Sequence, residues 1–191
     1  PVSASVVVKL PVLGRIKLIV HSKPGKHTPD VEYTFKDVGL KQNIPVLGLY
    51  PNYNNQITLI YTDLQGNERA RSNLKLQTKT LESRRLPKEI RVVKAQYDRM
   101  EPGMNLVNSP GQDETDTSIP YMIDAAGEIR WILDWEKSDE HRYIGIGCGL
   151  IRMQNGHYMT GDGNHHRMVE VDMMGNTIHN WDMLERGYTM H

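Results

Sequence analysis

Short stretches rich in β-branched residues, separated by Pro, Gly and Asn, make up the first part of the chain. Between residues 31 and 36, apolar Val31, Tyr33 and Phe35 alternate with polar Glu32, Thr34 and Lys36. This alternation is typical of a strand with one buried face. Strands are predicted at Ser5–Leu10, Arg15–Ser22, Val31–Asp37, Asn43–Tyr50, Asn55–Asp63 and Glu68–Thr80. Several short strands at this spacing predict a small β-sandwich.

A charged stretch that contains proline, LESRRLPKEI (Leu81–Ile90), follows the predicted sandwich. We interpret it as a solvated linker, because charged runs between periodic segments are usually exposed. A basic contact site at Arg84-Arg85 is the alternative. The sequence therefore predicts two domains, an N-terminal β-sandwich over residues 1–83 and a second β-domain over residues 84–191.

Beyond the linker the pattern changes to consecutive β-hairpins. They are predicted at Pro120–Leu133, Gly149–Asp162 and Arg167–Trp181, with turns at Ala126-Gly127, Asn155-Gly156 and Gly175-Asn176. Asn-Gly is among the strongest short signals for a hairpin turn. Successive hairpins at this spacing predict the blades of a β-propeller.

The hairpins also carry a weak internal repeat. An aspartate precedes the turn at Asp124 and Asp172, and a tryptophan follows it at Trp131 and Trp181. A propeller closes with four or more blades, whereas this segment has room for about one and a half. Because an open piece would leave unpaired strand edges, we expect the propeller to be incomplete in this chain.

Composition excludes some classes of function. Lys plus Arg and Asp plus Glu both number 23, so the formal charge is zero. Nucleic-acid surfaces need clustered positive charge, and we therefore expect no nucleic-acid partner. There is no run of 18 apolar residues, so we expect no membrane span. Cys148 is the only cysteine and forms no disulfide within this segment.

The densest polar cluster is TGDGNHHRMVEVD (Thr160–Asp172). A metal site is unfavourable here, because the adjacent His165 and His166 point to opposite faces of a strand. His157 and His179 belong to other hairpins, and nothing in the sequence fixes their partners. Two interpretations stay open: a loop with surface histidines, or the rim of a substrate funnel, where Asn164, His166 or Arg167 would touch a ligand.

Two other groups favour structural roles. The acidic residues Asp113, Glu114 and Asp116 are expected in a hydrated loop, although paired carboxylates also perform acid–base chemistry. The segment IGIGCGL (Ile144–Leu150) is followed by a strand rather than the helix that a phosphate-binding glycine loop requires. We expect Cys148 to be a small buried apolar residue and not a nucleophile.

Taken in order, the motifs resemble the bacterial arylsulfate sulfotransferases, which move a sulfuryl group between phenols without the nucleotide donor PAPS. The matching stretches begin with IPVLGLYPNYNNQITLIYTD and GMNLVNS, and continue through PYMIDAAGEIRWIL, GLIRMQNGHYM, MVEVDMMGNTIHNW and GYTMH. YPNYNN and DAAGEIRW are the most specific. The resemblance covers roughly Ile44 to His191.

The resemblance implies an N-terminal β-sandwich followed by a six-bladed β-propeller, a periplasmic location and a homodimer. It implies a phenolic sulfate donor, a phenol acceptor, and neither metal nor organic cofactor. The family's first active-site histidine follows the segment that GYTMH resembles, which makes His191 the expected catalytic residue. Tyr188 is the expected substrate-binding residue, and Trp131 and Trp181 are candidates for blade or funnel-wall positions. The histidine that becomes transiently sulfated, and its arginine neighbour, are expected outside these residues, so that this segment alone would be inactive.

One alternative of a different class stays open at this point. Propellers support many functions, and the fold alone is compatible with a non-catalytic propeller that binds protein or glycan.

Overall fold

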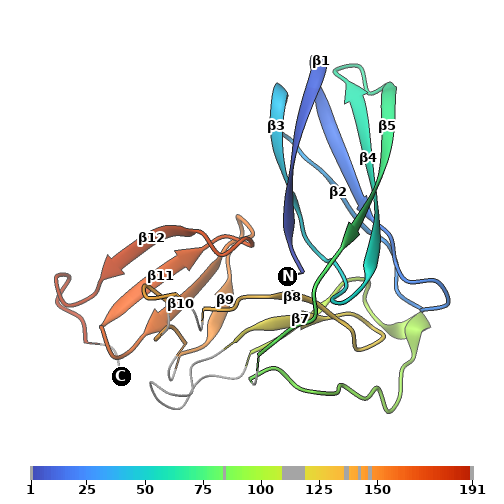
Figure 1. The fold of residues 1–191 in the computed structure, drawn as a ribbon. Helices are drawn as coiled ribbons and strands as arrows, with labels where there is room; N and C mark the ends of the chain where they lie inside the picture. The colour runs from blue at the N-terminus through green and yellow to red at the C-terminus, as the bar shows by residue number, and fades with distance from the viewer. Residues whose placement is uncertain are drawn as a thin grey trace. The chain divides into compact units, whose positions relative to one another are not determined.

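The structure is a computed structural model that describes residues 2–83, 85–108, 119–135, 138–141, 143–145 and 148–189 (Figure 1). Its strands are β1 (Ala4–Val20), β2 (Val31–Thr34), β3 (Gly39–Val46), β4 (Asn54–Asp63), β5 (Glu68–Gln77), β6 (Asn105–Val107), β7 (Tyr121–Ile123), β8 (Ile129–Ile132), β9 (Leu150–Arg152), β10 (Tyr158–Asp162), β11 (Arg167–Val171) and β12 (Thr177–Asp182). Within the described ranges, one 3-10 turn, η1 (Tyr97–Arg99), is the only helical element. The predicted all-β class is confirmed.

The chain forms two compact units. Unit 1 comprises Pro1–Asn105 and Ile123–Trp131, and unit 2 comprises Leu106–Met122 and Ile132–His191. Strands β1 to β5 form one five-stranded sheet, and β9 to β12 form a four-stranded sheet in the order β12-β11-β10-β9. Strands β6, β7 and β8 form a three-stranded sheet.

Strand β1 organises unit 1 because its two halves pair with different strands. Its N-terminal half pairs with β3 from Ala4 to Lys9, and its C-terminal half pairs with β4 and β2. The sequence predicted two separate strands here, whereas the backbone is one continuous strand. Pro11 lies where the β1–β3 ladder is interrupted, between Lys9 and Gly14. Proline has no N–H to donate, so it is tolerated at such an interruption.

The core of unit 1 comes from alternating positions on β1 and β3, from a continuous buried run on β4, and from two residues just after β3. Val20, Val46, Leu49 and Tyr50 are fully buried, and Ile16, Ile44 and Ile57 are nearly so. Full burial of an aliphatic side chain contributes about 1.5–3 kcal/mol relative to exposure. The bounds of β4 match the predicted strand Asn55–Asp63 closely, and β4 lies between β1 and β5 in the sheet.

The prediction that the apolar face of the strand beginning at Val31 is buried is wrong. Tyr33 on β2 is 54% exposed, and Phe35 is half-buried. The two rings contact each other edge-on, with centroids 4.9 Å apart. Strand β2 is only four residues long and, among the described strands, pairs with β1 alone. Alternation indicates that a strand has two chemically different faces, but it does not ensure that another layer covers the apolar one.

The YPNYNN stretch is a buried polar turn built around Asn55. The Asn55 amide oxygen accepts the Tyr50 N–H at 2.8 Å, and its nitrogen donates to the carbonyls of Tyr50 and Tyr53 at 3.0 Å. Asn52 has a φ of 47°, which asparagine tolerates better than most residues. Since buried backbone groups need partners, one asparagine satisfies a turn that would otherwise be left without them.

The second specific stretch, DAAGEIRW, is the predicted hairpin turn between β7 and β8. The Asp124 carboxylate accepts the backbone N–H groups of Ala126 and Glu128 at 3.0 Å, and Gly127 has a φ of 77°. Arg130 donates to the other Asp124 oxygen at 2.9 Å and to the Gly48 carbonyl at 2.8 Å. Within unit 1, the DAAGEIRW hairpin therefore packs against the segment that leads into YPNYNN.

Strands β9 to β12 are antiparallel neighbours, drawn in orange to red in Figure 1. The predicted turns at Asn155-Gly156 and Gly175-Asn176 join β9 to β10 and β11 to β12, and both glycines have positive φ. One face of the sheet is buried, with Tyr158, Thr160, Val169 and Val171 at 2% exposure or less. The register places Ile151, Met159, Glu170 and His179 in a row across the other face.

Candidate functional site

The alternating strand directions of this sheet divide its loops between two ends. The β10–β11 turn and the segment after β12 lie at one end, which we call the Asp162 end. The turns β9–β10 and β11–β12 lie at the other. The expected catalytic residue, His191, is outside the described residues, which reach Thr189. The segment that leads to His191 in the sequence therefore starts from the Asp162 end.

A compact turn begins this segment. The Asp182 carboxylate accepts the N–H groups of Leu184 and Glu185 at 2.8 and 3.1 Å. The Met183 N–H donates to the His166 carbonyl at 2.8 Å, and the Tyr188 N–H donates to the Met183 carbonyl at 2.8 Å. The approach to His191 is thus hydrogen-bonded to the β10–β11 turn.

The β10–β11 turn is organised by Asp162, whose side chain is completely buried. The Nε of Arg167 donates a hydrogen bond to Asp162 Oδ2 at 2.8 Å. His165 Nδ1 lies 3.0 Å from Oδ2 and 3.2 Å from Oδ1. The His165 ring lies against Tyr143, with centroids 4.8 Å apart. We call Tyr143, Asp162, His165 and Arg167 the Asp162 cluster.

Three residues were proposed for a funnel rim, Asn164, His166 and Arg167, and the structure leaves Asn164 exposed. Arg167 is 17% exposed at its side chain and is held by Asp162 and by the Glu140 carbonyl. His166 has a φ of 49°, and its carbonyl accepts the Met183 N–H. His165, which was not among the proposed rim residues, keeps half of its side-chain surface exposed. Asp162 was missed in the sequence analysis, although an aspartate three residues before a histidine in a turn is a usable local signal.

A second cluster surrounds Glu170 on the less buried face of the sheet. His157 Nδ1 lies 2.6 Å from one carboxylate oxygen and His179 Nδ1 lies 2.8 Å from the other. Asn155 donates to the same carboxylate at 3.0 Å. The hydrogen bonds from His157, His179 and Asn155 lower the pKa of Glu170 to about 2. The structure thus joins His157 and His179 to Glu170, a residue that the sequence analysis did not single out.

Trp181 stacks on His179, with the rings 15° from parallel and their centroids 5.1 Å apart. Trp131, the other repeated tryptophan, belongs to unit 1 and is buried. No three His, Cys, Asp or Glu side chains of the described residues are arranged to hold a metal ion. Within the same part of the chain, no helix has the length and apolar character needed to cross a bilayer.

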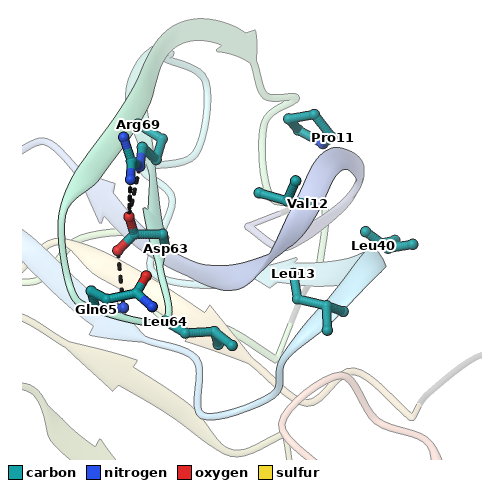
Figure 2. Close-up of a pocket in the computed structure, with 8 residues that line it drawn as sticks. All are labelled: Pro11, Val12, Leu13, Leu40, Asp63, Leu64, Gln65 and Arg69. Atoms are coloured by element: carbon teal, nitrogen blue, oxygen red, sulfur yellow. Dashed lines mark hydrogen bonds and ion pairs between the residues drawn. The ribbon is translucent and has the colours of Figure 1, made fainter.

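Unit 1 has a groove with a volume of about 580 Å³, whose lining residues differ in kind from those of the Asp162 and Glu170 clusters (Figure 2). It is lined by Pro11, Val12, Leu13, Leu40, Asp63, Leu64, Gln65 and Arg69. Asp63 and Arg69 pair with each other, as the dashed lines in Figure 2 show. The lining includes no histidine and no unpaired charge, so the groove offers no group for acid–base or covalent chemistry.

Comparison with known protein families decides the broader assignment. The family model described as arylsulfotransferase (ASST) matches residues 89–191, and that described as arylsulfotransferase Ig-like domain matches residues 1–79. The chain belongs to the arylsulfotransferase family. The resemblance seen in the motifs is confirmed, and the predicted N-terminal sandwich is an Ig-like domain. No protein of curated function matches the chain.

Membership in the arylsulfotransferase family assigns the chain to the sulfotransferase class, with aryl sulfates and phenols as substrates. Both clusters of unit 2 lie in the region that the arylsulfotransferase model matches. Only the Asp162 cluster is at the end of the sheet from which the chain leads to His191. Tyr188 lies at the same end and is 62% exposed.

Cys148 is half-buried rather than fully buried as expected. Burial, and secondarily the charge of Asp162, raise the pKa of its thiol. The neutral thiol is thereby favoured, which agrees with the prediction that Cys148 is not a nucleophile. The predicted acidic loop with Asp113, Glu114 and Asp116 lies outside the described residues, as does Arg84.

Proposed function

We propose that the chain belongs to a PAPS-independent arylsulfate sulfotransferase, which transfers a sulfuryl group from a phenolic sulfate ester to a phenol. The observation that carries this proposal is the arylsulfotransferase match over residues 89–191, which includes the GYTMH motif. The match of the Ig-like domain over residues 1–79 supports it, because both domains of the family occur in the expected order.

We further propose that the β9–β12 sheet is one blade of a six-bladed propeller. A blade is a four-stranded antiparallel sheet, and this sheet has that number of strands and that connectivity. The preceding β7–β8 hairpin supplies the start of an earlier blade in the same proposal. A homodimer and a periplasmic location are proposed from the family resemblance.

The chemistry accounts for the use of histidine. Sulfuryl transfer resembles phosphoryl transfer, since charge spreads over three non-bridging oxygens while nucleophile and leaving group stay in line. Hydrogen-bond donors around these oxygens lower the barrier. An acid must also protonate the departing phenolate, and a base must accept the proton of the incoming phenol. Imidazole can perform each of these tasks near neutral pH.

In the proposed ping-pong mechanism, His191 binds and polarises the sulfuryl oxygens. A different histidine, outside residues 1–191, attacks sulfur and carries the group as a sulfohistidine between the two half-reactions. Tyr188 is proposed to form part of the aromatic wall that holds the phenol ring. The mechanism invokes neither a metal nor an organic cofactor.

The test uses the full-length protein with p-nitrophenyl sulfate as donor and phenol as acceptor. The expected result is nitrophenol release that depends on phenol, with formation of phenyl sulfate, and a loss of at least about 100-fold in His191→Ala. Release that does not require phenol would indicate a sulfatase instead. No release with any phenolic donor would indicate a propeller that binds protein or glycan without catalysis.

A further inference from the structure

The contact between His165 and Asp162 determines which ring nitrogen carries a proton. An ionised carboxylate accepts hydrogen bonds and donates none. His165 Nδ1, at 3.0 and 3.2 Å from the two Asp162 oxygens, therefore holds the hydrogen. In a neutral imidazole the other nitrogen, Nε2, is then the acceptor. Among the described residues, Nε2 of His165 has no hydrogen-bond partner.

Asp162 is itself held in place by a cation. Its side chain has no exposed surface, and Arg167 Nε donates to Oδ2 at 2.8 Å. The guanidinium group also donates to the Glu140 carbonyl, which fixes Arg167. The Tyr143 ring lies 4.8 Å from the His165 ring, at an angle of 36°, and limits its rotation. His165 is therefore anchored through Nδ1, and half of its side-chain surface is exposed.

This arrangement matches that of a histidine that transfers protons in catalysis. A buried carboxylate on Nδ1 fixes the ring and the tautomer, and stabilises the imidazolium that forms when Nε2 takes up a proton. The backbone of the neighbouring His166 shapes the turn, since its carbonyl accepts the Met183 N–H and its φ is 49°. His165 therefore has the anchored orientation that proton transfer through Nε2 requires.

The position of His165 supports the same conclusion. The β10–β11 turn lies at the Asp162 end of the sheet, from which the chain leads to His191. The hydrogen bond from Met183 to the His166 carbonyl links the two segments directly. His157 and the Glu170 cluster occupy the region towards the opposite end, so they do not share this position.

We propose that His165, oriented by Asp162, is a further catalytic residue of the sulfotransferase and transfers the phenol proton through Nε2. This inference rests on the proposed function. As the bond between sulfur and the donor's aryl oxygen breaks, and the nucleophilic histidine bonds to sulfur, Nε2 gives its proton to the departing phenolate. In the second half-reaction, neutral Nε2 takes the proton of the acceptor phenol. The phenol oxygen then bonds to sulfur, and the bond from sulfur to the nucleophile breaks.

The acidity of the acceptor tests this step in the full-length protein. The donor is p-nitrophenyl sulfate, whose acidic leaving group needs little protonation, so the variants report mainly on the second half-reaction. Turnover is measured with a series of phenols of increasing acidity for the wild-type protein and for His165→Gln. A base matters most for weakly acidic phenols and little for those that are already ionised.

With unsubstituted phenol, His165→Gln is expected to lower kcat by about 100-fold or more, the range of general acid–base catalysis. With the most acidic phenols the loss is expected to fall below about 10-fold, and added imidazole should restore part of the activity with phenol. His157→Gln is the matched control, because His157 also contacts a carboxylate through Nδ1 but lies towards the other end of the sheet. It should show the same dependence on acceptor acidity as the wild-type protein.

The outcomes separate this inference from the proposed function. If the wild-type protein transfers the group and His165→Gln loses an equal factor with every phenol, or loses nothing, His165 is structural and the inference is wrong. Circular dichroism and thermal unfolding check that the half-exposed His165→Gln variant keeps its fold. If the wild-type protein transfers to no phenol, the proposed function is wrong, and the inference falls with it.

Discussion

The guanidinium carbon of Arg130 lies 3.6 Å from the centroid of the Tyr50 ring. The two residues belong to the two stretches that most specifically resemble the family, and they meet across 80 positions of sequence. Arg130 is 1% exposed and also bonds to the Gly48 carbonyl and to Asp124. The Lys23 ammonium group also lies over the Tyr50 ring, 4.6 Å from its centroid. The two stretches thus contact each other within unit 1 through a buried cation–π pair.

Replacing Arg130 is expected to destabilise unit 1 strongly. Arg130→Ala leaves the buried Asp124 charge without its partner, a change that costs about 3–5 kcal/mol. Arg130→Lys keeps the charge but loses both the planar stacking on Tyr50 and the paired donors, so it is expected to recover only part of the loss. Denaturant unfolding of the full-length protein measures the change. Arg71→Ala, which removes an exposed pair with Glu68, is the control and should have a negligible effect.

Gly14 is expected to be irreplaceable at the point where β1 pairs with both β3 and β4. A Cβ at this position would overlap the Tyr61 ring and the Thr62 carbonyl oxygen. Because the carbonyl belongs to the backbone, it cannot move without breaking the β1–β4 ladder. Gly14→Ala should therefore cost about 1–3 kcal/mol or more.

The paired glycine on β3 provides the comparison. A Cβ on Gly39 would meet its nearest atom at 3.5 Å, an ordinary contact. Gly39→Ala is expected to change the denaturation midpoint little. Equal effects of the two substitutions would show that the close packing of β1 against Tyr61 is not what restricts Gly14.

Features set by neighbouring residues could be predicted from the sequence, whereas features set by distant contacts could not. The turns at Asn155-Gly156 and Gly175-Asn176 were predicted correctly, because the turn residues themselves require that backbone. The exposure of Tyr33 was missed, because alternation does not report what covers a strand. A contact such as Arg130 with Tyr50 depends on the packing of distant segments, and no local pattern predicts it.

In the candidate site, too, the local cluster of polar residues was predictable from the sequence, whereas the contacts between them were not. The sequence identified the Thr160–Asp172 region as the densest polar cluster, and both carboxylates that organise the histidines, Asp162 and Glu170, lie within it. It did not assign partners, since the contacts of Glu170 with His157 and His179 depend on the register of three strands. His191 came from the family resemblance alone, and its role stays a prediction.

The Glu170 cluster predicts a dependence of stability on pH. Its hydrogen bonds lower the pKa of Glu170 from an ordinary 4.5 to about 2 in the folded state. A carboxyl group with a lowered folded pKa stabilises the protein above its unfolded pKa, and this contribution is lost as the pH falls through the folded pKa. The stabilisation should therefore be complete near neutral pH and diminish from about pH 4.5 towards pH 2.

Glu170→Gln removes the charge and tests this expectation. Urea midpoints measured from pH 7 to pH 3 should differ between wild-type and variant at neutral pH, and the difference should shrink below about pH 4.5. Glu82→Gln, at an exposed position between the two family matches, is the control and should follow the wild-type profile. A difference that stays constant down to pH 3 would show that the carboxylate charge of Glu170 is not the cause.

Asp182 is expected to affect activity more than stability. Its carboxylate holds the turn at the start of the segment that leads to His191. If His191 polarises the sulfuryl oxygens, then loosening this turn displaces it, and misplacement by about 1 Å can cost about 100-fold in rate. Asp182→Ala should therefore lower kcat/KM for p-nitrophenyl sulfate by roughly 10- to 100-fold.

Asp172 provides a matched control, because it holds the β11–β12 turn at the other end of the sheet by accepting the N–H groups of Met174 and Asn176. Asp172→Ala removes the same kind of turn and should leave kcat/KM within about 3-fold of wild type, with a similar small loss of about 1 kcal/mol in stability. If both variants lose activity equally, the loss reflects general weakening of the sheet rather than the position of His191.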